Sequence, residues 1–267
     1  MEVMRDVRYR SGGDPGAAES PLCTLDLYAP AGPTEGAGDA VRRRSPVLVW
    51  FHGGGLIEGD RHGTAPLCER LAENGVIVAN ADYRLSPAVT FPAYVEDAAA
   101  AVAWAVRWAR SEGEASGAGP GRVFVGGHSA GGYLAAMLAM DPRYLEAAGV
   151  APGSVAGYVP VSGQMLTHAA VRSERGLPPG ALVADEASPL YYVRPDAPPL
   201  LLLVADDDLP ARKEEAQLFV AALTEGAGSK TTRLLVVPGR DHGSVGSELL
   251  TPGDTAGLAV LAFLRGE

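Results

Sequence analysis

The chain has 267 residues, of which 47% are hydrophobic and 20% charged, and its formal net charge is -10 at pH 7. This composition is typical of a soluble globular protein with a substantial core, and the acidic balance argues against nucleic acid or an anionic membrane as a partner, because both require a basic face. The N-terminus is charged and lacks the apolar stretch of a signal peptide, and no apolar run approaches the ~20 residues that span a bilayer. We therefore expect a cytoplasmic protein.

Short apolar runs alternate with helical patterns along the chain. The runs are bounded by turn residues, and their near-continuous hydrophobicity is typical of strands covered on both faces of a parallel sheet. In chain order the predicted strands are 23–29, 46–51, 75–80, 122–127, 155–161, 199–205 and 232–238. The predicted helices are 91–113, 130–141, 210–226 and 254–267. Such alternation predicts an α/β fold with right-handed crossovers and a mostly parallel sheet.

Two stretches interrupt this alternation. Residues 30–45 are rich in glycine, proline and charge, and they predict an exposed loop. Residues 162–198 are longer than a simple crossover needs, which indicates either a lid or pocket-forming insertion, or a crossover helix with a tolerated insertion. Neither stretch has the character of a separate unit, so we expect a single domain over 1–267. The two cysteines, Cys23 and Cys68, belong to no metal-binding motif, and buried free thiols are the simplest prediction for them.

Residues 126–132 read GGHSAGG and stand directly between a predicted strand and a predicted helix. The motif Gly-His-Ser-Ala-Gly around Ser129 matches the nucleophile elbow, in which a serine at a sharp strand-to-helix turn projects from the carboxyl edge of the sheet. The small neighbours of that serine prevent clashes between the strand and the helix. Ser129 is therefore the predicted nucleophile, and the alternative is a glycine-rich turn with an incidental serine.

A second glycine run follows the predicted strand 46–51 and reads HGGG over residues 52–55. Acyl transfer to a serine needs donors for the oxyanion of the tetrahedral intermediate, and fixed main-chain N–H groups suit this purpose. Glycines let the chain turn such groups towards one point without obstruction by side chains. The expected donors are the N–H groups of Gly53, Gly54 and Ala130.

A serine nucleophile needs a general base and an orienting carboxylate. His242 is the predicted base, because it follows the last predicted strand in the order serine, aspartate, histidine. The acid should follow the preceding strand, where Asp206, Asp207 and Asp208 occur together. Three adjacent carboxylates cannot all face one imidazole, and the residues alone leave the choice open. Since the base must be neutral, we expect activity to fall below about pH 6 to 7.

Taken together, these motifs resemble those of α/β-hydrolase esterases, near the hormone-sensitive-lipase-like and feruloyl/acetyl-esterase-like members. The matching residues are 52–55, 82–87, 91–92, 96–97, 127–132, 206–210 and 241–242. The resemblance implies a sheet of about eight strands with helices on both faces and a small cap or none. It also implies that Asp208 is the catalytic acid, with Asp206 as the second choice, and that the elements 82–87 and 96–97 are mainly structural.

The function that the resemblance implies is hydrolysis of a small-molecule carboxylic ester through an acyl-enzyme, without a metal or an organic cofactor. An aryl formamidase, similar to kynurenine-formamidase-like enzymes, or a small peptidase would use the same residues, because the leaving group is selected in the pocket. A non-catalytic small-molecule-binding protein on a hydrolase fold is the alternative of another class. The candidate substrate-binding residues are Leu56, His128, Met165 and Leu166.

Overall fold

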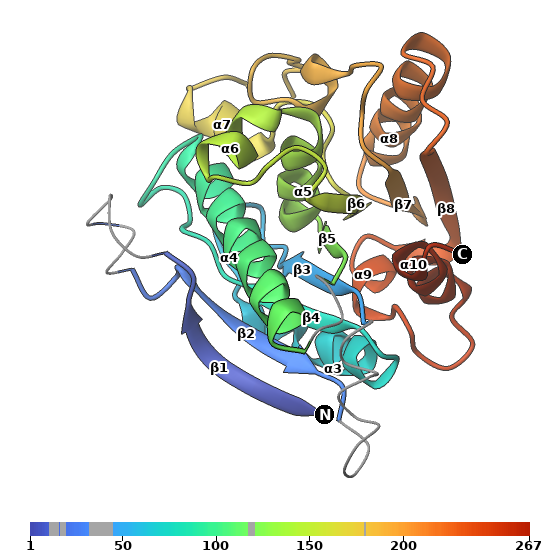
Figure 1. Ribbon diagram of the computed structural model, residues 1–267. Coiled ribbons are helices and arrows are strands. Elements are labelled where there is room, and N and C mark those ends of the chain that lie inside the picture. Colours follow the sequence, from blue (N-terminus) through green and yellow to red (C-terminus); the bar gives the residue numbers. More distant parts are fainter. Residues whose placement is uncertain (11–15, 17–19, 32–44, 117–120, 179) are drawn as a thin grey trace.

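An eight-stranded sheet forms the centre of the protein in a computed structural model, which describes residues 1–10, 16, 20–31, 45–116, 121–178 and 180–267 (Figure 1). The spatial order of the strands is β1-β2-β4-β3-β5-β6-β7-β8. The strands β3 to β8 run parallel, whereas β1 and β2 are antiparallel at one edge. The predicted α/β class and mostly parallel sheet are confirmed, while most of the predicted loop 30–45 lies outside the described residues.

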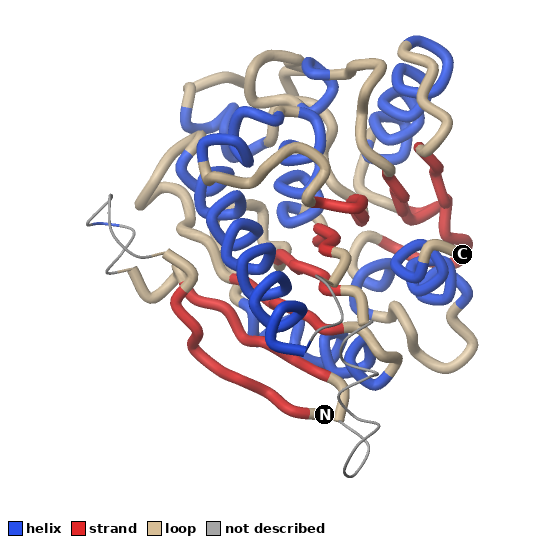
Figure 2. The backbone as a smooth tube through the Cα atoms, viewed as in Figure 1, coloured by secondary structure: helices blue, strands red, loops and turns tan. Residues whose placement is uncertain are grey.

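Seven of the strands match predicted ones within a few residues. The strands are β1 (Glu2–Arg8), β2 (Thr24–Ala29), β3 (Val47–Phe51), β4 (Ile77–Ala81), β5 (Val123–His128), β6 (Val155–Val161), β7 (Leu200–Asp207) and β8 (Thr232–Asp241). The sequence did not predict β1, because most of its residues are exposed and several are charged. In Figure 2, β1 lies at the edge of the sheet, where it pairs with β2 and its outer side is open to solvent, which explains why this composition is tolerated.

Helices cover both faces of the sheet. They are α3 (Ala65–Glu73), α4 (Ala93–Ser116), α5 (Ala130–Met140), α6 (Pro142–Ala147), α7 (Ala169–Glu174), α8 (Arg212–Ala221), α9 (Ser244–Ser247) and α10 (Thr255–Arg265), with short turns η1 (Arg61–Thr64), η2 (Pro189–Tyr192) and η3 (Ala222–Gly226). One layer contains α4, α5 and α8, and the other contains α3, α9 and α10 (Figure 1). Within the described part of the chain, none of these helices is both long enough and apolar enough to cross a bilayer.

The core lies in two clusters, one on each face of the sheet. In β3 the odd-numbered residues pack against α4 and α5, and the even-numbered residues pack towards α3 and α10. Side chains that alternate between two buried faces explain why the strand sequences are apolar throughout. Each cluster also holds one cysteine, Cys23 in the first and Cys68 in the second, and both are buried free thiols as predicted.

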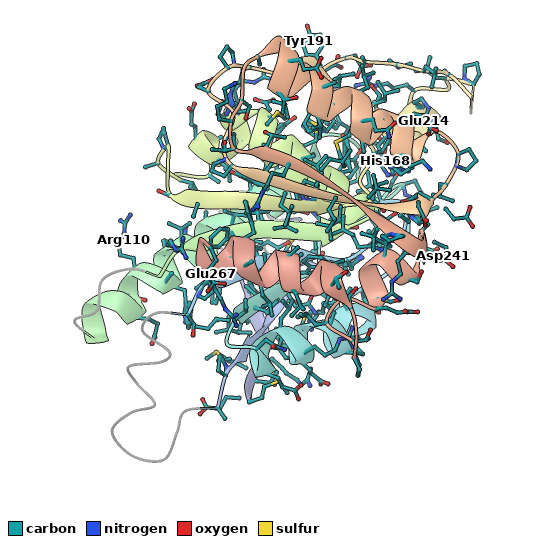
Figure 3. The ribbon with its side chains drawn as sticks, turned by 90° about the vertical axis from the view of Figure 1, so that its right-hand side faces the viewer. Arg110, His168, Tyr191, Glu214, Asp241 and Glu267 are labelled. Atoms are coloured by element: carbon teal, nitrogen blue, oxygen red, sulfur yellow. The ribbon has the colours of Figure 1, made fainter. Side chains whose placement is uncertain are left out.

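The carboxyl ends of the parallel strands meet at one edge of the sheet, as expected for parallel neighbours. The chain leaves β3 into the glycine run 52–55, β5 into α5, β7 into α8 and β8 into α9. Figure 3 shows the sheet between α8 and α10, with Asp241 at the end of β8. The predicted functional residues therefore come from different strands to one edge.

Candidate active site

The turn from β5 into α5 is made by Ser129. Its φ of 56° and ψ of -113° lie in a region that non-glycine residues rarely occupy. Its main-chain N–H donates to the carbonyl of Val161 at 2.8 Å. A Cβ atom on Gly131 would lie 2.0 Å from the carbonyl oxygen of Phe51, so this position accepts only glycine. The strained turn and its glycine explain the motif that the sequence shows.

His242 contacts two other predicted site residues. Its Nε2 lies 2.8 Å from the Ser129 hydroxyl, and its Nδ1 lies 2.6 Å from Oδ1 of Asp208. The side chain of Asp208 is 1% exposed and that of His242 is 21% exposed. A proton on Nδ1 would be donated to the carboxylate and would leave Nε2 as the acceptor for the serine. The structure thus brings the three residues together from the ends of β5, β7 and β8.

The aspartates at the carboxyl end of β7 have separate partners. Burial acts to raise the pKa of Asp208, but hydrogen bonds from His242 and Ser162 outweigh this effect and lower the pKa to about 2. Asp206 is exposed, and its carboxylate accepts two main-chain N–H groups of β8 at 3.0 and 3.3 Å. Its role in the structure is to join the ends of β7 and β8. The geometry favours Asp208 as the partner of His242.

His128 supports the main chain of His242. Its Nε2–H donates to the His242 carbonyl at 2.6 Å, and the two ring centroids are 5.0 Å apart. Burial lowers the pKa of His128 to about 4, so this ring is neutral near pH 7 and carries its proton on Nε2. The structure therefore gives His128 a contact within the protein. Its predicted contact with substrate stays a prediction.

The glycine run after β3 lies against the nucleophile turn. A Cβ atom on Gly53 would lie 3.3 Å from the Cβ of Ser129. Gly54 has a φ of +106°, and its carbonyl accepts two N–H groups of the following turn at 3.0 Å each. As the first residue of α5, Ala130 has an N–H without an acceptor inside the helix. Two of the three predicted oxyanion donors are thus direct neighbours of Ser129, and Gly54 is one residue further along the loop.

His52 and the element 82–87 pack against this glycine loop and fix its position. The ring of His52 stacks on Tyr83 with centroids 4.4 Å apart, and its Nδ1 hydrogen-bonds to the carbonyl of Gly53 at 2.6 Å. The Tyr83 hydroxyl donates to the carbonyl of His52 at 3.0 Å. Next to it, Arg84 donates twice to the buried carboxylate of Asp97, at 2.8 and 2.9 Å. These contacts give the elements 82–87 and 96–97 structural partners.

The other predicted pocket residues are buried to different degrees. Leu56 is completely buried, Met165 is 1% exposed and Leu166 is half-buried. The main-chain N–H groups of Met165 and Leu166 both donate to Glu215 of α8, at 3.0 and 3.3 Å. This carboxylate fixes the start of the segment 162–198, which also contains α7 and η2. The substrate-binding role of these residues and the lid or pocket role of the segment stay predictions.

Ser162, at the end of β6, is a site residue that was not predicted from the sequence. Its hydroxyl donates to Oδ2 of Asp208 at 2.5 Å, and its side chain is buried. Ser162 belongs to no motif, but one signal was available. A polar residue followed by glycine at the carboxyl end of a predicted parallel strand lies where such folds bind ligands.

Several charged side chains lie around the site. In the stretches that the structure describes, no three or more His, Cys, Asp or Glu side chains are grouped so that they could hold a metal ion. Asp241, labelled in Figure 3, lies next to His242, and its carboxylate accepts from the N–H and hydroxyl of Ser244 at 2.7 and 2.8 Å. These hydrogen bonds lower the pKa of Asp241. This carboxylate shapes the loop that carries His242.

Similar proteins are known. A family model described as the alpha/beta hydrolase fold matches residues 48–178. The esterase LipQ of Mycobacterium tuberculosis is 32% identical over 219 residues, which cover 75% of this chain and 50% of that protein. A hyperthermophilic esterase from the archaeon Pyrobaculum calidifontis is similar in structure, with a TM-score of 0.67 and 25% identity over 99% of this chain and 84% of that one. Esterase B from Lactobacillus rhamnosis has the same fold, with a TM-score of 0.72 and 20% identity over 99% and 86% of the two chains. This chain spans about half the length of the curated relatives that it matches.

Proposed function

Since the chain belongs to the α/β-hydrolase family, we propose that it is a serine hydrolase that cleaves small carboxylic esters through an acyl-enzyme. The observation that carries this proposal is the pair of hydrogen bonds at His242, to the hydroxyl of Ser129 at 2.8 Å and to the carboxylate of Asp208 at 2.6 Å. An imidazole between a serine hydroxyl and a buried carboxylate is the arrangement that activates serine for acyl transfer. The esterase names of the similar proteins support the same chemistry.

In the first step, the Ser129 oxygen forms a bond to the ester carbonyl carbon while Nε2 of His242 takes the serine proton. The imidazolium that results is stabilised by Asp208, whose pKa of about 2 keeps the carboxylate ionised near pH 7. Asp208 accepts the hydrogen bond from Nδ1–H of His242. It thereby selects the tautomer in which Nε2 is unprotonated and can accept the serine proton.

The negative charge that develops on the carbonyl oxygen needs fixed donors. The N–H groups of Gly53, Gly54 and Ala130 are the proposed donors, and removal of one such donor costs roughly 10²- to 10³-fold in rate in serine hydrolases. The N-terminus of α5 adds its partial positive charge. The stack of His52 on Tyr83 keeps the glycine loop in place, so that little reorganisation is needed during the reaction.

The tetrahedral intermediate then collapses. The bond to the alcohol oxygen breaks, and His242 returns its proton to that oxygen, which leaves Ser129 acylated. A water molecule next loses a proton to His242 and attacks the acyl carbon, and the proton passes back to the serine as the carboxylic acid leaves. All proton transfers in this sequence run through one imidazole.

The test is covalent labelling combined with ester turnover. We expect a fluorophosphonate probe to label the wild type on Ser129, and p-nitrophenyl esters of increasing acyl length to be hydrolysed. Ser129→Ala should lose both the label and at least about 10³-fold of the activity, whereas Ser111→Ala, which removes an exposed hydroxyl on α4, should keep both.

The outcomes separate the rival functions. Turnover of N-formylkynurenine well above that of the esters would identify an aryl formamidase, and preference for peptides would identify a peptidase. A wild type that is neither labelled nor active would exclude the proposal and favour a binding protein on a hydrolase fold. Activity that survives in Ser129→Ala would exclude the mechanism.

A further inference from the structure

The end of β6 carries a second serine in a strained conformation. Ser162 has a φ of +48°, is 2% exposed, and donates its N–H to the carbonyl of Leu203 at 2.8 Å. A left-handed backbone at a non-glycine residue persists only where its surroundings hold it in place, and such residues concentrate at functional sites. The conformation of Ser162 therefore indicates a role beyond filling space.

The hydroxyl of Ser162 holds one oxygen of Asp208 while His242 contacts the other. The distances are 2.5 Å from Ser162 Oγ to Oδ2 and 2.6 Å from His242 Nδ1 to Oδ1. Main-chain N–H groups of Ala205 and Leu209 also donate to this carboxylate, at 3.2 and 2.7 Å. With both oxygens held, the carboxylate cannot rotate away from the imidazole.

The sheet order explains why Ser162 reaches this place. β6 lies between β5 and β7, so its carboxyl end stands between the strand that leads to Ser129 and the strand that leads to Asp208. The carbonyl of Val161 accepts the N–H of Ser129 at 2.8 Å. A Cβ atom on Gly163 would lie 2.6 Å from the carbonyl carbon of Gly132 in α5. Three consecutive residues thus contact the nucleophile turn, the acid and the helix behind the nucleophile.

We propose that Ser162 is a positioning residue, whose hydroxyl orients Asp208 against His242 while the end of β6 fixes the acid relative to the nucleophile turn. This inference rests on the proposed function, because it assigns Ser162 to the same site. Ser162 exchanges no proton with the substrate, and it acts through Asp208 alone.

The hydroxyl also has a predictable electrostatic effect. The hydrogen bond from Ser162 stabilises the negative charge on the Asp208 carboxylate. When this donor is removed, more of the negative charge acts on His242, and the protonated form of the imidazole is favoured. The other charged or titratable groups that face this pair are His128 from β5, Arg212 from α8 and Asp241 beside His242. These groups stay in a Ser162 variant, so that a change in the pH profile reports the missing hydroxyl.

The experiment compares Ser162→Ala and Ser162→Gly with the wild type in kcat/KM for a p-nitrophenyl ester between pH 5 and 9. Both variants should lower the plateau roughly 3- to 30-fold and move the acid limb upward by about half a pH unit, because a hydrogen bond to a charged group is lost. Glycine tolerates the left-handed backbone at this position, so Ser162→Gly carries the test where the alanine variant fails to fold.

Ser229→Ala is the matched control. It removes another buried serine hydroxyl, which hydrogen-bonds to the Thr232 hydroxyl at 2.9 Å at the start of β8, away from the site. We expect it to lower the melting temperature and leave the pH profile unchanged. Ser162 variants with the wild-type plateau and acid limb would overturn the inference while esterase activity stands. A wild type without esterase activity would instead overturn the proposed function.

Discussion

Two serines stand at the two ends of one chain of hydrogen bonds, and they differ in their surroundings. Ser129 ends β5 with a φ of 56° and Ser162 ends β6 with a φ of 48°. Between them run His242 and Asp208, with successive distances of 2.8, 2.6 and 2.5 Å. A residue with a positive φ thus presents a hydroxyl at each end, to the base at one end and to the acid at the other.

The two serines differ in accessibility and in the element that each one leads into. Ser129 leads directly into α5, and its hydroxyl contacts His242, whose side chain is partly exposed. A nucleophile needs such access, because the substrate has to reach it. Ser162 leads into the long segment before β7 and is 2% exposed, so its hydroxyl reaches only the protein. A strained strand end thus presents its serine either for reaction or for support, and the exposure of the side chain distinguishes the two roles.

The link between the two serines is Asp208, and its removal should have the largest effect. Asp208→Asn replaces one accepting oxygen with an NH2 donor, so the side chain can no longer accept from both Ser162 and His242 Nδ1. The neutral amide also does not stabilise the His242 cation, and its NH2 group favours the wrong tautomer of the imidazole. We expect kcat for a p-nitrophenyl ester to fall roughly 10⁴-fold, with little change in the circular dichroism of the fold. Steady-state kinetics at pH 8 measure this loss.

Asp206→Asn is the control for this substitution, since the carboxylate of Asp206 accepts main-chain N–H groups of β8 and does not contact His242 in the described structure. It should keep kcat within a factor of about three, because surface substitutions away from the site have small effects. Loss of activity in Asp206→Asn together with an active Asp208→Asn would reverse the assignment of the acid.

His168, which lies outside the hydrogen-bonded chain, should lower the free energy of unfolding as the pH falls. His168 caps α7, is 4% exposed and lies against Tyr133 with the ring centroids 5.0 Å apart, and Figure 3 shows it between α8 and the sheet. Burial, with the charges of Arg212 and Arg172, lowers the pKa of His168 to about 3. Below about pH 6.5, His168 binds a proton in the unfolded protein but stays neutral in the folded protein. The free energy of unfolding therefore falls by about 1.4 kcal/mol per pH unit as the pH is lowered to about 3.

His168→Asn keeps a side-chain acceptor for the helix cap and removes this titration. We expect the loss of stability between pH 7 and pH 5 to be smaller in the variant than in the wild type by about 2 kcal/mol. Urea unfolding at both pH values measures the difference. Equal losses in the two proteins would show that the folded state binds the proton on His168.

The sequence predicted those parts of the protein that depend on local pattern. Continuous apolar runs located seven strands, and the order of Ser129 and His242 along the chain placed both at strand ends. Asp208 was selected over Asp206 through resemblance alone, because adjacent carboxylates look alike in a sequence. The contacts of Ser162 and His128 were out of reach, since they depend on which strands are neighbours in the sheet. The position of β6 between β5 and β7 is a tertiary fact that no local pattern encodes.

The smallest expected effect tests whether the two strand ends store the same backbone strain. A left-handed conformation costs an L-residue roughly 1 kcal/mol that glycine avoids. Ser129→Gly should therefore be more stable than Ser129→Ala by about 1 kcal/mol, and Ser162→Gly should exceed Ser162→Ala by a similar amount. Each pair lacks the same hydroxyl, so the difference within a pair reports the backbone alone, and guanidinium unfolding measures it. A difference at Ser129 without one at Ser162 would mean that the hydrogen bond to Asp208 imposes the conformation of Ser162, and that the backbone relaxes once the hydroxyl is gone.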